Sequence, residues 1–251
     1  MDFSGKVAIS TGAASGMGLL FAQNFAELGG NVVLCDVNEE ALKEKVDEIN
    51  SKGKGKAVGV LCDVRDYNQV KNACKTCVDT FGSIDIVCNF AGGTARRVLN
   101  VPGNLDFPDV PIDVFDWGLD VNLKGPFYFA HASLGIMKNQ QSGLIINIGS
   151  ITGEEGDPQG MDYPTAKAGL MHGLTKSIAQ YGAPYGIRCV CVSPGPVLTR
   201  EAMSKMKTLL GRAAQPQEII DLVLFLASDK GQFINGENIM IDGGRNVMRR
   251  G

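Results

Sequence analysis

The sequence lacks long apolar runs, an excess of basic charge and any cluster of histidines. No uncharged apolar stretch reaches the roughly 18 residues that a membrane-spanning helix needs. A net charge of −3 at pH 7 provides no basic surface for nucleic acid or for an anionic membrane. The two histidines, His131 and His172, stand far apart in the chain. We therefore expect no nucleic acid and no membrane partner, and no metal site.

Cysteine spacing gives no disulfide framework either. The seven cysteines are an odd number, and most fall in apolar strand-like runs, as small core residues do. Cys74 and Cys77 have the spacing of a metal or redox pair, but they occur in a helical pattern without a second thiol pair. Residues 1–6 lack the basic and apolar regions of a signal peptide. We expect a soluble, cytoplasmic protein.

What the sequence does contain is an alternation of short apolar runs and longer helical patterns over 251 residues. Strands are expected at residues 7–10, 31–35, 57–62, 84–89, 144–148, 188–192 and 238–241. Helices are expected at residues 16–28, 39–51, 66–81, 114–139 and 162–181. Such alternation is typical of a parallel sheet covered on both faces. The pattern predicts one α/β domain, residues 1–251, built on a doubly wound parallel sheet (a Rossmann fold).

Two segments break this rhythm, residues 93–113 and 199–214. Both follow predicted strand ends, and ligands bind at the carboxyl ends of the strands in such sheets. We expect substrate specificity to reside in these segments. Residues 201–206 are expected to form a short helix whose Met203 and Met206 either cover a pocket or pack in the core.

A glycine-rich turn follows the first predicted strand. Its glycines let the backbone turn tightly and approach a pyrophosphate at a helix N-terminus; they are Gly12, Gly16 and Gly18. Asp36 ends the second strand, where a carboxylate accepts hydrogen bonds from an adenosine ribose. Its charge would repel a 2′-phosphate, and neither Ser15 nor Val37 supplies a compensating cation. These residues favour NAD over NADP.

Tyr163 and Lys167 form a Tyr-x-x-x-Lys pair downstream of Ser150. At i and i+4 on a helix the two side chains share a face, close enough for an ammonium to favour the phenolate. Because an unperturbed phenol has a pKa of about 10, lowering it by roughly three units requires about 4 kcal/mol. We expect Lys167 and the positive ring of an oxidised cofactor to supply it jointly. Pro164 requires the helix to begin just before it.

Further motifs accompany these residues, namely Asp63-Val64, the run from Asn89 to Gly92, Asn122 and Pro194-Gly195. In this order and spacing, the chain resembles the short-chain dehydrogenases/reductases over essentially its full length. It resembles both the 3-oxoacyl reductases and the secondary alcohol dehydrogenases of that family. Phe90 departs from the family pattern, which usually has an asparagine there.

The resemblance assigns roles to individual positions. Tyr163 would exchange the substrate's proton, Ser150 would hydrogen-bond the substrate oxygen, and Asn122 would hold a water that links Lys167 to solvent. The implied catalytic residues are therefore Asn122, Ser150, Tyr163 and Lys167. The implied cofactor-binding residues are Gly12, Ser15, Gly16, Met17, Gly18, Asp36, Val37, Asp63, Val64, Asn89, Ala91, Gly92, Tyr163, Lys167, Pro194, Gly195, Val197 and Thr199.

Substrate contacts are less determined by the sequence. The candidates are Arg96, Thr152, Glu154, Arg200 and Met203. The arginines, together with Arg97, suit an anionic substrate. Glu154, with Glu155 and Asp157 in the same loop, favours a polyol or a cation instead. The charge of the substrate stays open at this point.

The resulting hypothesis is an NAD(H)-dependent oxidoreductase that interconverts a secondary alcohol and its ketone. Candidate substrates are a sugar, a polyol, a hydroxysteroid or a hydroxy acid. A 3-oxoacyl thioester reductase is the alternative within the family, although that activity normally uses NADPH. A non-catalytic NAD(H)-sensing binding protein is the alternative from another class. The resemblance also implies a homotetramer.

Overall fold

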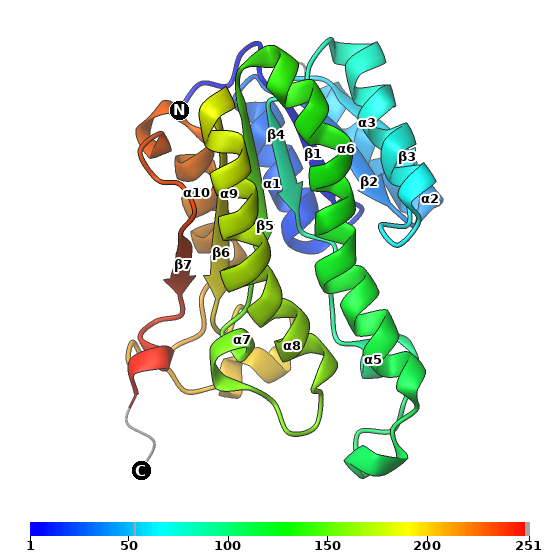
Figure 1. Ribbon diagram of the computed structural model, residues 1–251, viewed down its shortest axis with the longest axis vertical. Helices are drawn as coiled ribbons and strands as arrows, with labels where there is room; N and C mark the ends of the chain where they lie inside the picture. The colour runs from blue at the N-terminus through cyan, green and yellow to red at the C-terminus, as the bar shows by residue number, and fades with distance from the viewer. Residues whose placement is uncertain (53, 249–251) are drawn as a thin grey trace.

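A seven-stranded parallel sheet forms the centre of the molecule, in the order β3-β2-β1-β4-β5-β6-β7 (Figure 1). The computed structural model describes residues 1–52 and 54–248; residues 249–251 of the predicted domain lie outside that part. The strands are β1 (Val7–Thr11), β2 (Asn31–Asp36), β3 (Ala57–Leu61), β4 (Ile86–Asn89), β5 (Gly143–Ile148), β6 (Ile187–Pro194) and β7 (Asn238–Ile241). The predicted doubly wound sheet is confirmed.

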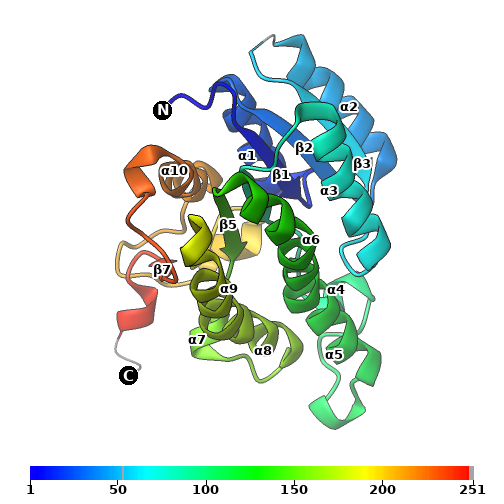
Figure 2. The same cartoon turned by 45° about the horizontal axis from the view of Figure 1, so that its top comes forward.

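Helices cover both faces of this sheet. One face carries α1 (Gly16–Glu27), α2 (Glu39–Ser51) and α10 (Pro216–Ala227). The other carries α3 (Tyr67–Phe81), α6 (Gly125–Gln140) and α9 (Thr175–Gly182), which lie side by side in Figure 2. Each face has its own apolar cluster, with Phe21 and Ile219 buried in the first and Val70 and Phe129 buried in the second. The core therefore lies on both sides of the strands, as their near-continuous apolar sequence requires.

Short elements gather beyond the carboxyl ends of the strands. They are α4 (Ala95–Val98), η1 (Phe107–Asp109), α5 (Ile112–Leu119), α7 (Thr152–Glu155), α8 (Asp162–Ala168) and η5 (Glu201–Lys205). In Figure 1, the arrowhead of β7 points toward the end of the molecule that holds α7 and α8. The two segments singled out in the sequence, residues 93–113 and 199–214, both belong to this end. The short helix expected at residues 201–206 is a 3₁₀ helix.

Two predicted helices contain a π-helical segment that the sequence pattern does not reveal. One is η2 (Asp120–Lys124), between α5 and α6, and the other is η3 (Gly169–Leu174), between α8 and α9. In the second, the hydroxyl of Thr175 donates to the carbonyl of Leu170 at 2.7 Å. Such segments often mark functional sites. Here the first contains Asn122 and the second begins two residues after Lys167.

A buried polar network ties the sheet to the second of these helices. The Asn89 amide donates to Oδ1 of Asn147 at 2.9 Å, and the Asn147 amide donates to the Thr175 hydroxyl at 3.0 Å. All three side chains are at most 2 % exposed. Because buried polar groups are costly without partners, the network fixes β4, β5 and α9 in one arrangement.

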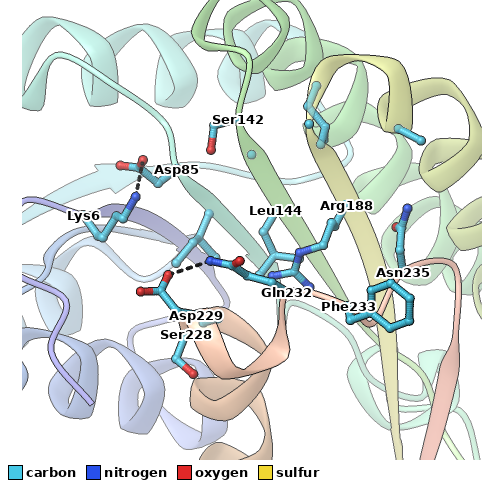
Figure 3. A pocket seen from close by; sticks show the side chains of 16 residues that line it. Lys6, Asp85, Ser142, Leu144, Arg188, Ser228, Asp229, Gln232, Phe233 and Asn235 are labelled. Atoms are coloured by element: carbon cyan, nitrogen blue, oxygen red, sulfur yellow. Dashed lines mark hydrogen bonds and ion pairs between the residues drawn. The ribbon is translucent and has the colours of Figure 1, made fainter.

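A cavity of about 480 Å³ opens at the amino ends of β4, β5 and β6 (Figure 3). Lys6 lies 3.6 Å from Asp85 at this cavity. The guanidinium of Arg188 donates to three main-chain carbonyls, at the end of α10 and in the loop beyond it, at 2.9–3.1 Å. The cations here already have protein partners. The candidate catalytic residues lie at the opposite, carboxyl edge of the sheet.

The seven cysteines are all buried and free, as the sequence predicts for core residues. Among the residues that the structure describes, no helix combines the length and apolar character needed to cross a bilayer.

The Asn147 network yields a stability prediction. Asn147→Ala should leave the buried Asn89 amide without its partner, which costs about 1–3 kcal/mol of unfolding free energy, and should remove one of the two hydrogen bonds of the Thr175 hydroxyl, which keeps its bond to the Leu170 carbonyl. Denaturant unfolding monitored by circular dichroism measures the loss. Asn139→Ala, at an exposed position on α6, is the matched control and should change stability by less than about 0.5 kcal/mol. Equal stability of the two variants would contradict the role of the network.

Candidate active site

The side-chain amide of Asn122 joins the loop after β4 to the helix that contains η2. Its Oδ1 accepts from the Gly93 amide at 3.0 Å, while its Nδ2 donates to the carbonyls of Gly93 at 3.0 Å and Gly118 at 2.9 Å. Asn122 is fully buried. Since both side-chain amide hydrogens are already donated, a water held by the Asn122 side chain would have to donate to Oδ1. Its expected role in holding a water remains a prediction.

Lys167 lies beside this junction. A β-carbon built on Gly92 would stand 2.7 Å from Oδ1 of Asn122 and 3.5 Å from Nζ of Lys167. Glycine is therefore required at that position. Nζ of Lys167 donates to the main-chain carbonyl of Ile148 at 2.6 Å and lies 5.5 Å from the centre of the Tyr163 ring. Burial lowers the pKa of Lys167 to about 8.

Ser150 follows β5 and is oriented by its neighbour Thr152. The Thr152 hydroxyl donates to Oγ of Ser150 at 2.9 Å, and the Thr152 amide lies 3.2 Å from the same oxygen. The Ser150 hydroxyl in turn faces Tyr163 in the same pocket and acts to lower the pKa of the phenol. Thr152, a candidate substrate residue in the sequence, thus orients the Ser150 side chain. Tyr163 occupies the first turn of α8, which begins at Asp162 as Pro164 predicts.

The surroundings of Tyr163 act on its pKa in opposite directions. Burial raises the pKa above its ordinary value, whereas the Ser150 hydroxyl and the charges of Arg200 and Arg97 act to lower it. The Lys167 ammonium is turned to the Ile148 carbonyl and lies over the face of the Tyr163 ring. Its expected action on the phenol, jointly with an oxidised cofactor ring, stays a prediction.

One pocket of about 380 Å³ brings two of the predicted catalytic residues together with nicotinamide-side residues, while Asn122 and Lys167 do not line it. It contains Ser150 and Tyr163 and the predicted cofactor residues Met17, Pro194, Gly195, Val197 and Thr199. It also contains the candidate substrate residues Thr152, Arg200 and Met203. The two ends of the segment 199–214, which contributes Arg200, Met203 and Met206 to the pocket, lie side by side. The Leu198 amide donates to the Ala214 carbonyl and the Ala214 amide donates to the Pro196 carbonyl, both at 2.9 Å.

The turn between β1 and α1 fits a pyrophosphate. Gly16 has a φ of +58°, and a β-carbon there would meet no atom within 4 Å, so the space beside it is open. Gly12 has a φ of +61°, and its β-carbon would stand 2.9 Å from Cα of Ala91. Ser15, the residue before α1, makes no side-chain cap to the helix. The first amides of α1 are left for an anion to accept from. Gly18 packs against the carbonyl of Gly12, which a β-carbon would approach to 2.5 Å.

Other predicted cofactor residues follow β2, β3 and β4 at the same edge. Asp36 ends β2, where its carboxylate accepts from the amides of Ala14 at 3.0 Å and Asn38 at 3.1 Å. Asp63, just after β3, is paired with Arg65, which lowers the pKa of that carboxyl. Val37 is exposed beside Asp36. The amide of Ala91 donates to the Thr11 hydroxyl at 2.9 Å and joins the ends of β4 and β1.

Two of these positions turn toward the protein interior. Val64 is buried, and its side chain would meet a β-carbon on Gly125 at 2.8 Å, so it packs against the start of α6. Asn89 ends β4 with its side chain in the Asn147 network. Any cofactor contact of these residues would have to use the main chain. Phe90, the departure from the family pattern, packs on Phe21 with the ring centres 5.7 Å apart.

Two candidate substrate residues lie outside the catalytic pocket. Arg96 lines a neighbouring cavity and its guanidinium approaches the Leu105 carbonyl at 3.3 Å, while the adjacent Arg97 lines the catalytic pocket. Glu154 is bonded to Nε2 of His172 at 2.7 Å. The sequence places Arg96 and Arg97 equally near the site, and only the direction of α4 separates them.

Sequence reasoning overlooked the main-chain part of the site. The Ile148 carbonyl that holds Lys167 and the Gly93 amide and carbonyl that hold Asn122 carry no side-chain signal. The repeated glycines after β4 were the available hint, because Gly92 leaves room for Asn122 and Lys167.

Comparison with known proteins identifies the family of the chain. A family model described as enoyl-(acyl carrier protein) reductase matches residues 12–246. A trans-4-hydroxycyclohexanecarboxylate dehydrogenase of Sinomonas cyclohexanicum is 39% identical over 248 residues, which cover 95% of this chain and 92% of the relative.

Solved structures agree as well. A 3-oxoacyl-[acyl-carrier protein] reductase from Brucella melitensis, crystallised with bound NAD, superposes with a TM-score of 0.87 at 30% identity, covering 97% of this chain and 92% of that one. A short-chain type dehydrogenase/reductase from Mycobacterium marinum superposes with a TM-score of 0.89 at 35% identity, covering 98% and 97%. With its parallel sheet, its glycine turn and its Ser150, Tyr163 and Lys167 site, the chain belongs to the short-chain dehydrogenase/reductase family of oxidoreductases.

Proposed function

We propose that the protein is an NAD(H)-dependent dehydrogenase that interconverts a secondary alcohol and its ketone. The observation that carries the proposal is the single pocket in which Ser150 and Tyr163 meet Gly195 and Val197. A hydroxyl donor, a phenol and a surface for a flat ring are the parts that coupled proton and hydride transfer needs. A nicotinamide dinucleotide, when bound, supplies the hydride acceptor or donor.

Tyr163 and Ser150 handle the proton and the charge on the substrate oxygen. In oxidation, the Tyr163 oxygen takes the proton of the alcohol, and in ketone reduction it returns one. Ser150 donates a hydrogen bond to the substrate oxygen and stabilises negative charge that develops there. Thr152 supports this role, since its bonds to Oγ hold Ser150 in one orientation. Because burial raises the pKa of Tyr163, the positive charges around it have to assist phenolate formation.

Lys167 has a positioning role in this proposal. Its ammonium donates to the Ile148 carbonyl and lies over one face of the Tyr163 ring. From there it would also bind a cofactor ribose. With a pKa of about 8, it can also release or accept a proton near neutral pH. Asn122 would assist this proton exchange by holding a water that donates a hydrogen bond to the asparagine and links Lys167 to solvent.

NAD is the proposed cofactor rather than NADP. The carboxylate of Asp36 at the end of β2 is held by two main-chain amides, so its negative charge is fixed where a 2′-phosphate would lie. The related Brucella melitensis reductase has NAD bound. Because that relative is a 3-oxoacyl reductase, reduction of a 3-oxoacyl thioester is the second candidate activity of this chain.

A homotetramer in the cytoplasm remains a prediction. Phe127 on α6 is 45% exposed and Phe233 before β7 is fully exposed, as residues at a subunit interface are in an isolated chain. Static light scattering reporting a monomer would contradict the tetramer.

Tyr163→Phe tests the mechanism directly. Without the hydroxyl, proton transfer loses its acid/base, and kcat should fall by about 10²–10⁴ for a secondary alcohol with NAD, read by absorbance of the reduced nicotinamide. Cofactor affinity should change little. Tyr181→Phe, which removes an exposed hydroxyl on α9, is the matched control. Unchanged turnover in Tyr163→Phe would refute the mechanism, and cofactor binding without turnover in the native protein would favour the sensing alternative.

Asp36→Asn tests the cofactor assignment while keeping a side chain of the same shape. The native enzyme should have a lower KM for NAD than for NADP, and the variant should reduce the preference at least roughly tenfold as the repulsion disappears. Asp47→Asn, an exposed acid on α2, should leave the preference intact. A native KM lower for NADP would overturn the assignment.

Lys167→Met tests the cost of burying an ammonium. A folded pKa of about 8, below the ordinary 10.5, means that the unfolded chain binds more protons between pH 8 and 10.5, so this group makes stability rise with pH in that window. The stability of Lys167→Met relative to the native chain should be greatest below pH 8 and should decline by about 3 kcal/mol toward pH 10.5. Urea unfolding at pH 7 and pH 10 measures this difference. The exposed Lys205→Met should show no comparable change with pH.

A further inference from the structure

The catalytic pocket carries two guanidinium groups at its rim. Arg97 comes from α4 in the segment after β4, and Arg200 comes from the segment after β6, so two separate parts of the chain place a cation at the same pocket. Both side chains are largely exposed to solvent. Among the residues that the structure describes, no ion pair involves either of them.

The acids expected to oppose these cations are mostly engaged elsewhere. Glu154 is bonded to His172 at 2.7 Å, and Glu155 is paired with Arg245 at 3.0 Å. Neither glutamate lines the pocket, whereas Asp157 does. The pocket rim therefore carries two guanidinium groups against one carboxylate.

This positive charge reaches the reacting group. Arg200 and Arg97 are the two charged residues that act to lower the pKa of Tyr163 against the effect of burial. Both arginines are thus close enough to act on the phenol electrostatically. An anion bound between them would be near the substrate oxygen as well.

The chemistry of the pocket selects a class of anion. A guanidinium matches a carboxylate through two parallel N–H donors. The remaining lining includes Ile151, Met203 and Met206, which suit a hydrocarbon body.

We infer that Arg97 and Arg200 form an anion subsite and that the physiological substrate is a hydroxy acid or the corresponding oxo acid. Its carboxylate binds at the rim of the pocket while its alcohol or ketone group reaches Ser150 and Tyr163. The inference rests on the proposed dehydrogenase function and narrows it to one of the substrate classes that the sequence leaves open.

The kinetic test compares hydroxy acids with their isosteric primary amides in the NAD assay. The native enzyme should favour each acid over its amide at least roughly tenfold in kcat/KM, because a charge-assisted hydrogen bond is lost with the amide. Arg97→Gln and Arg200→Gln should each reduce this ratio toward one, mainly through KM for the acid. Lys205→Gln, which removes an exposed cation of η5 outside the pocket, should keep the native ratio.

A binding test makes the inference independent of turnover. With NAD present, cyclohexanecarboxylate should bind the native protein at least roughly tenfold more tightly than cyclohexanecarboxamide by isothermal titration calorimetry, and either arginine variant should lose that preference. Turnover of neutral alcohols with no preference for acids in either test would overturn the anion subsite and leave the dehydrogenase proposal intact. A carboxylate preference that depends on the arginines, without turnover of any alcohol, would support the subsite and overturn the dehydrogenase proposal.

Discussion

The hydrogen bonds between the Asn122 amide and the main chain of Gly93 are the constraint on which the site depends. They hold the loop after β4 against the helix through η2, and they leave no room for a side chain on Gly92, where Lys167 also approaches. The π-helical geometry at residues 120–124 lets a fully buried amide satisfy all its donors inside one junction. Lys167 lies beside this junction, where the Ile148 carbonyl holds its ammonium.

Burial opposes ionisation of both titratable side chains at the site, Tyr163 and Lys167. An ammonium and a phenol are both enclosed at the carboxyl edge of the sheet, and burial shifts the pKa of each toward its neutral form. Arg97 and Arg200 at the rim act in the opposite sense on Tyr163. The same arginines line the pocket in which the substrate would bind.

The fold and the catalytic residues could be predicted from the sequence because their signals are local. Buried strands read as continuous apolar runs, and the glycine turn, Ser150, Tyr163 and Lys167 have fixed spacings. The remainder depends on tertiary geometry. The distinction between Arg96 and Arg97 depends on the direction of α4, the pairing of Glu154 with His172 joins positions 18 residues apart, and the carbonyl of Ile148 has no sequence signature. For the same reason, the Tyr-x-x-x-Lys spacing places the two side chains near each other but does not orient the ammonium, which the structure turns to the Ile148 carbonyl.

The central claim is that hydride leaves the carbinol carbon for a nicotinamide while Tyr163 takes the hydroxyl proton. The most direct measurement uses a secondary alcohol, preferably a hydroxy acid, with deuterium on its carbinol carbon, and determines by mass spectrometry where the label goes after oxidation with NAD. The account predicts one deuterium in the reduced cofactor for each ketone formed. Release of the deuterium to water, or formation of ketone without reduced cofactor, would contradict it.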